Sequence, residues 1–234
     1  MTTVENAAAY QPAEIEVVAR LLLRDQAIRV LPGAWWSYHP ERGEVVYPAN
    51  LLAEWPADRS LGALCHEIAE VLFSGPQAAT VVPDFVERAA MQGCEPRAAA
   101  LLLNAVNDLR VNQRYLERFP GSKRYLNAVY QSAKPLDPLT DPAAPRARNA
   151  LAHHALLSAL TGRWASGLGV AAPPPDQRVA RAADSLWPAV ARSIDAASLA
   201  DLARIVLAEV LPEYTALLQR DRDDARQSPL DDES

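Results

Sequence analysis

Apolar side chains recur every three or four residues along most of the chain, a spacing that is typical of amphipathic helices. It predicts helices over residues 13–24, 58–74, 83–91, 96–119, 122–132, 147–161, 177–191 and 197–219. Between the first two, three short segments rich in Val, Ile, Trp and Tyr (27–31, 34–40 and 44–48) predict a small antiparallel sheet with a hairpin around residues 41–43. We therefore expect an α+β fold that is mostly helical, with the sheet beside a helical bundle.

Composition sets the domain organisation. Half of the 234 residues are hydrophobic, which suits one domain over residues 1–220. Residues 134–145 are rich in proline and predict a loop, and residues 221–234 predict a disordered acidic tail. The net charge of -6 argues against nucleic-acid binding. No apolar run is long enough for a membrane span, and the chain starts without a signal-peptide pattern, so we expect a cytoplasmic protein without membrane contact.

The predicted helix over 58–74 has an unusually narrow polar sector. His66, Glu70 and Ser74 fall on one line along it, Glu67 lies beside that line, and apolar side chains occupy the rest. No Lys or Arg occurs between Ser60 and Ser74, whereas a surface helix normally carries several. A mostly buried helix with an imidazole and two carboxylates needs a cation or a basic side chain in that sector, because burying unpaired charge is costly.

The long helix over 96–119 carries a second acid in an apolar setting. Asp108 lies on an apolar stripe, with Asn104 one turn before it and Asn112 one turn after it. The opposite side looks solvated and carries Asn107, Arg110, Gln113, Arg114 and Glu117. Asp108 is therefore a second buried acid whose charge requires compensation.

One bound metal ion would compensate the buried acidic side chains of both helices. His66 and Glu70, four residues apart, can point at one ion, and Asp108 would supply a third ligand. Glu67 could accept a proton from a water molecule held by the metal, as the glutamate of an HExxH zinc-peptidase helix does. One histidine and two acids form an oxygen-rich set, so Mn²⁺ or Mg²⁺ compete with Zn²⁺.

The two segments also resemble a known family. HEIAEVLFSG and LLNAVNDLRVNQRYLERFPGSKRYL are similar to the zincin-like metallopeptidase domains that accompany von Willebrand factor A domains in cobaltochelatase-like proteins, encoded beside AAA-type ATPases. Those domains have an HExxH helix and then a helix of the form L-N-x-x-[ED]-D-x-R, followed by Y/F-P-G. The resemblance covers about residues 25–130. It implies a zincin-like fold, metal ligation by His66 and Asp108, and a general-base role for Glu67.

Two positions depart from the family pattern. Glu70 stands where the second histidine would be, giving HExxE, and Asn107 stands where the pattern often has glutamate. A more negative ligand set weakens the Lewis acidity that makes a bound water reactive. The D-x-S-x-S metal motif of a von Willebrand factor A domain is absent from the sequence, so such a domain would be a separate partner.

Three functional hypotheses follow. The first is a metal-dependent hydrolase, a zincin-type metallopeptidase acting on a peptide or protein with Glu67 as the base. The second is a catalytically inactive zincin-like module that works with an AAA-type ATPase or another protein partner. The third is a helical binding protein without metal. In that case the polar sector meets water or pairs with an arginine, for which Arg59, Arg110 and Arg114 are the candidates. In the first two, Asn104 and Asn112 would support the ligands by hydrogen bonds.

Overall fold

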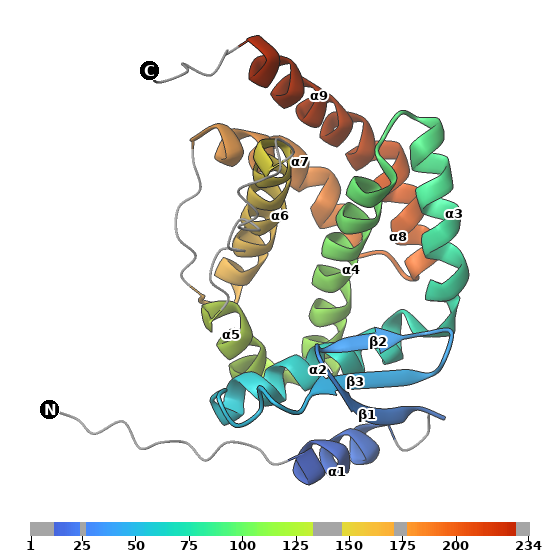
Figure 1. Cartoon of the computed structure of the whole chain (residues 1–234), viewed down its shortest axis with the longest axis vertical. Helices are drawn as coiled ribbons and strands as arrows, with labels where there is room; N and C mark the ends of the chain where they lie inside the picture. Colours follow the sequence, from blue (N-terminus) through green and yellow to red (C-terminus); the bar gives the residue numbers. More distant parts are fainter. Residues whose placement is uncertain (1–11, 24–26, 133–146, 171–176, 228–234) are drawn as a thin grey trace, which may run out of the picture.

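The computed structural model describes residues 12–23, 27–132, 147–170 and 177–227. Most of these residues are helical and three short strands form one sheet, so the fold is α+β and mostly helical, as predicted. Figure 1 shows the sheet and the first helix at one end of the molecule and the later helices stacked at the other end. The predicted proline-rich loop at 134–145 lies outside the described residues.

The sheet is mixed, which corrects the prediction of an antiparallel sheet. Its strands are β1 (Arg29–Gly33), β2 (Ser37–His39) and β3 (Glu44–Pro48), in the spatial order β1-β3-β2. β2 and β3 form the predicted antiparallel hairpin, whose turn includes Gly43 at φ 59°. β1 pairs in parallel with β3 instead of antiparallel with β2, because the chain crosses to the far side of β3 before the hairpin begins. β3 therefore becomes the central strand.

The helices follow the predicted order. They are α1 (Pro12–Leu22), α2 (Ala57–Phe73), α3 (Ala78–Met91), α4 (Pro96–Arg118), α5 (Lys123–Ser132), α6 (Ala147–Gly167), α7 (Gln177–Ile194), α8 (Leu199–Ile205) and α9 (Leu211–Gln227). A π-helical turn, Val206–Val210, joins α8 to α9. α3 begins before the predicted start at residue 83, so Pro83 lies inside the helix. α9 continues past residue 221, where we expected the disordered tail to begin, and residues 228–234 lie outside the described residues.

α4 is the longest described helix, and its start follows directly from the sequence. Pro96 occupies the first helical position, where a missing N–H costs nothing. The side chain of Glu95 caps the helix by accepting hydrogen bonds from the backbone N–H groups of Arg97 and Ala98, both at 3.0 Å. The helix ends at Arg118, before the Phe119-Pro120 pair.

Two hydrophobic clusters lie along α4. One joins α4 to α3 and α6–α9 and includes Leu102, and the other joins the sheet, α1, α2 and α5 to the end of α4 and includes Val111. Gly62 lets α2 approach α5 closely, because a Cβ atom there would lie 2.1 Å from the carbonyl oxygen of Tyr125. α2 also packs against α4, and the predicted site residues lie where these two helices meet.

Candidate metal centre

α2 is mostly buried, as its composition predicts. Ten of its residues are buried, among them Glu67, which is only 6% exposed. His66 and Glu70 lie one turn apart on the helix and are partly exposed. The helix therefore exposes part of the His66 imidazole and part of the Glu70 carboxylate, whereas the Glu67 carboxylate is buried.

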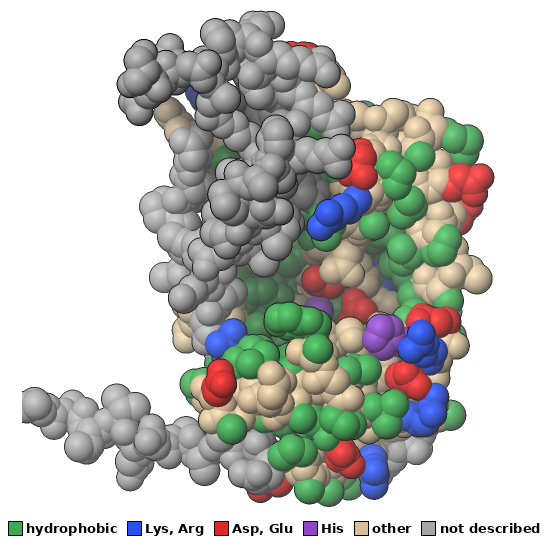
Figure 2. Space-filling view, in the orientation of Figure 1, with side chains coloured by type: hydrophobic (Ala, Val, Ile, Leu, Met, Phe, Trp, Pro, Cys, Tyr) green, Lys and Arg blue, Asp and Glu red, His purple; other side chains and the backbone are tan. Residues whose placement is uncertain are grey.

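α4 brings Asp108 to the same place. The Nε2 atom of His66 lies 3.8 Å from Oδ1 of Asp108. One ligand atom from each of His66, Glu70 and Asp108 lies within 4.8 Å of the others, and this is the group of three potential ligands found among the described residues. About a quarter of the His66 and Asp108 side chains is accessible to solvent. Figure 2 shows a histidine and acidic side chains at the floor of a hollow above the sheet.

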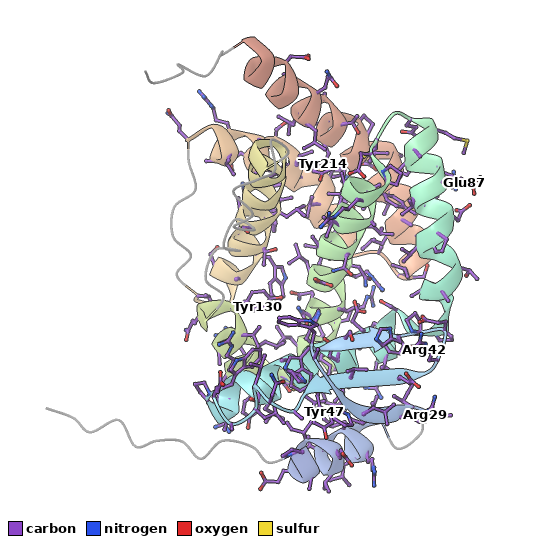
Figure 3. The ribbon with its side chains drawn as sticks, viewed as in Figure 1. Arg29, Arg42, Tyr47, Glu87, Tyr130 and Tyr214 are labelled. Carbon is purple, nitrogen blue, oxygen red and sulfur yellow. The ribbon has the colours of Figure 1, made fainter. Side chains whose placement is uncertain are left out.

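Hydrogen bonds from α4 orient the imidazole. Nδ1 of His66 lies 3.1 Å from Oδ1 of Asn112, and the Asn112 amide donates to the hydroxyl of Tyr130 at 2.6 Å. Because Asn112 uses its amide nitrogen on Tyr130, its oxygen is free to accept the Nδ1 proton of His66. That tautomer leaves the lone pair of Nε2 facing Asp108, which is the arrangement that a metal-binding histidine requires. Figure 3 shows Tyr130 at the end of α5.

Asn104 contacts the acid one turn after it. Its side-chain amide donates to Oδ2 of Asp108 at 3.3 Å. Asn104 and Asn112 therefore both hydrogen-bond to members of the cluster, on either side of Asp108. Tyr130 was not singled out by the sequence, because a tyrosine on a separate helix gives no local signal of its contact with Asn112.

A second network fixes Glu70 and corrects the sequence analysis. Asn107 and Arg110 were expected on a solvated side of α4, but they are 6% and 0% exposed. The Asn107 amide donates to Oε1 of Glu70 at 3.1 Å and to Oγ of Ser74 at 2.9 Å. Arg110 donates to the carbonyl oxygen of Phe73 at 2.9 Å and to Oδ1 of Asn107 at 3.0 Å. This side of α4 is polar because it packs on the end of α2.

The electrostatics of the cluster are dominated by burial and by three neighbouring carboxylates. Burial raises the pKa of Glu67 to about 8; His66 opposes this shift, and Glu70 and Asp108 reinforce it. Burial lowers the pKa of His66, but the charges of Asp108, Glu67 and Glu70 outweigh it and raise the pKa to about 9. Burial also raises the pKa of Asp108. The metal-free site therefore keeps protons on these groups near neutral pH, and a bound cation would have to displace them.

One buried oxygen of the cluster accepts no hydrogen bond from the described residues. Oδ1 of Asp108 is buried and accepts no hydrogen bond from any described residue, although it faces His66. A buried acceptor without a partner is unfavourable, and an ion between the three side chains would satisfy it. The residues present therefore fit a divalent metal.

The arginines considered as alternatives lie elsewhere in the described part of the chain. Arg110 is bound to the end of α2, as above. Arg114 donates to the carbonyl oxygens of Asp195 and Ala196, and the guanidinium of Arg59 stacks on Trp55 at 3.8 Å from the ring centroid. Within the described residues, none of the three forms a direct ion pair with the cluster, although Arg110 interacts electrostatically with Glu70.

The described residues contain no helix that combines the length and the hydrophobicity needed to cross a membrane. Comparison with known proteins finds no matching protein-family profile, no matching curated sequence and no matching solved structure. The site's own geometry is therefore the basis for inferring what it does.

Proposed function

We propose that this chain is a divalent-metal-dependent hydrolase of the zincin type, a peptidase in which His66, Glu70 and Asp108 bind the ion. The observation that carries the proposal is the convergence of one imidazole and two carboxylates from separate helices, within 4.8 Å of one another. The buried oxygen of Asp108 that accepts no hydrogen bond supports it. The imidazole favours Zn²⁺, and the two carboxylates keep Mn²⁺ and Mg²⁺ as competitors.

Each residue around the ion would have a separate role in hydrolysis. The ion, when bound, would act as a Lewis acid that polarises a water molecule and the substrate carbonyl. Glu67 adjoins His66 in the sequence and interacts electrostatically with His66, Glu70 and Asp108. It would accept the proton of the attacking water and pass it to the leaving amine. Asn112 would hold the imidazole in the binding tautomer, and Asn107 would hold the carboxylate of Glu70.

A second candidate function is a zincin-like module that binds metal without catalysis and works with an AAA-type ATPase or another protein. The low exposure of Glu67 favours it, because a general base must reach a water molecule beside the substrate. The second acidic ligand, Glu70, favours it too, because added negative charge weakens activation of the water.

A single set of measurements separates these functions. Zinc content and cleavage of a broad peptide library are measured for the wild type, for Glu67→Gln and for the control Glu87→Gln, whose side chain is exposed on α3 (Figure 3). A hydrolase retains zinc in all three proteins and loses cleavage only in Glu67→Gln. Cleavage that survives Glu67→Gln contradicts the proposed base. Stoichiometric zinc without any cleavage supports the non-catalytic module, and absence of zinc contradicts both.

A further inference from the structure

A cleft of about 330 Å³ opens beside the proposed metal centre, between the end of α2 and helices α3, α4 and α8. Glu70 lines it, and so do Asn104 and Asn107. Glu70 belongs to the ligand cluster, and the two amides hydrogen-bond to Asp108 and Glu70. The cleft therefore shares Glu70 with the cluster, and a molecule in the cleft lies next to the ion site.

The remaining walls of the cleft are mostly apolar. They consist of Ala78 and Val82 from α3, Ala100, Leu101 and Leu103 from α4, and Leu199 from α8. Leu103 and Leu199 are also buried members of the large hydrophobic cluster, so these walls are fixed by the core behind them. A volume of this size lies within the range of ligand pockets, and apolar walls favour an apolar group.

One cation lies along the cleft. Arg97 lines it from the first turn of α4, two turns before Asn104, which is about 10 Å along the helix axis. Its side chain is exposed, and no acidic side chain in the described part of the chain forms an ion pair with it. The cleft thus has Glu70 and two amides at the end near the ion site and apolar walls in the middle. At the other end, the guanidinium of Arg97 is available to bind an anion.

We propose that this cleft is the substrate pocket of the metal centre and that it accepts an apolar group ending in a carboxylate. The substrate class is a peptide with an apolar residue beside the cleaved bond and a carboxylate beyond it, on an acidic side chain or at the C-terminus. This inference rests on the proposed function, because the metal anchors the substrate. It goes further in naming the residues that select the substrate. Ala100 and its apolar neighbours select the apolar residue, and Arg97 selects the carboxylate.

Alkyl hydroxamates test the pocket without requiring activity, because the hydroxamate group chelates the metal and the chain extends from it. Binding of acetohydroxamate, octanohydroxamate and the monohydroxamate of octanedioic acid is measured by calorimetry on the zinc-loaded protein. We expect octanohydroxamate to bind at least about tenfold more tightly than acetohydroxamate, since each buried methylene strengthens binding about fourfold.

Matched variants assign the effect to the cleft. Ala100→Phe fills it from α4 and Ala78→Phe fills it from α3, and each should remove the gain of the long chain while acetohydroxamate and zinc still bind. Arg97→Gln should weaken the octanedioic compound about two- to fivefold and leave octanohydroxamate unchanged. Arg118→Gln, which removes an exposed charge at the other end of α4, should affect neither.

The outcomes distinguish the two proposals. Absence of zinc binding overturns the metal centre and, with it, the pocket. Zinc and acetohydroxamate binding without any gain from the longer chain overturns the pocket alone. Two further hydroxamates identify the source of the carboxylate. A succinyl hydroxamate coupled to leucine offers a C-terminal carboxylate, and the same compound coupled to leucyl-glutamic acid α-amide offers only a side-chain carboxylate. The source is the one whose binding is weakened by Arg97→Gln, and an equal lack of effect on both overturns the role of Arg97.

Discussion

Replacing Glu67 with glutamine is expected to stabilise the metal-free protein at alkaline pH. Glu67 is 6% exposed, and its neighbours include two further carboxylates. Glutamine has nearly the same shape and cannot ionise, so the substitution removes a buried charge without opening a cavity. Residues that serve chemistry are commonly unfavourable for the fold, and this position should show that conflict directly.

The magnitude and the direction follow from the pKa of Glu67, which burial raises from 4.5 to about 8. Each pKa unit corresponds to about 1.4 kcal/mol, so ionising this group in the folded chain costs about 5 kcal/mol more than in the unfolded chain. Because the folded chain binds the proton more tightly, stability falls as the pH rises from 4.5 to about 8, and the loss is complete above that. We expect Glu67→Gln to gain about 2 to 4 kcal/mol at pH 9 and much less at pH 5.

The assay is guanidinium unfolding at pH 5 and pH 9 with a chelator present, because a bound ion would compensate the charge. Glu87→Gln is the control, since it makes the same chemical change at an exposed position of α3. Its effect should be small and the same at both pH values. Equal unfolding free energies of Glu67→Gln and the wild type at pH 9 would refute the argument, as would a difference that does not depend on pH.

Three other predictions concern the same region. Zinc at 100 times its dissociation constant should raise the melting temperature by about 5 to 10 °C, and His66→Ala should abolish this shift in a thermal scan while His39→Ala keeps it. Asp108→Ala should weaken zinc binding more than about 100-fold and Asn107→Ala about tenfold; equal losses in a competition titration would contradict their different positions. Arg110→Ala should lower the unfolding free energy by about 3 kcal/mol, and a loss below about 1 kcal/mol in urea would show that its hydrogen bonds contribute little.

Much of the fold could be predicted from periodicity and helix-boundary residues. The 3.6-residue spacing located the helices because each buries an apolar stripe, and Pro96 marked the start of α4 because proline suits a first helical position. The pairing partner of β1 could not be predicted. Residues 41–43 specify a turn between β2 and β3, but nothing local specifies on which side of β3 the first strand lies.

The site was predictable where polar residues stand out against apolar ones. His66 and Asp108 each interrupt an apolar surface, and this is why their meeting could be anticipated from separate segments. Asn107 and Arg110 were misplaced for the opposite reason. A helix face with several polar residues looks solvated in projection, and only the packing of α2 on α4 reveals that it is buried.

The binding of one metal ion by His66, Glu70 and Asp108 is tested most directly by a crystal structure of the zinc-loaded protein. The ion is located by anomalous scattering at the zinc edge. We expect one strong peak between α2 and α4, about 2.0 to 2.2 Å from Nε2 of His66 and from one carboxylate oxygen each of Glu70 and Asp108. A map without a peak there, or with the zinc bound only by other side chains, would contradict this expectation.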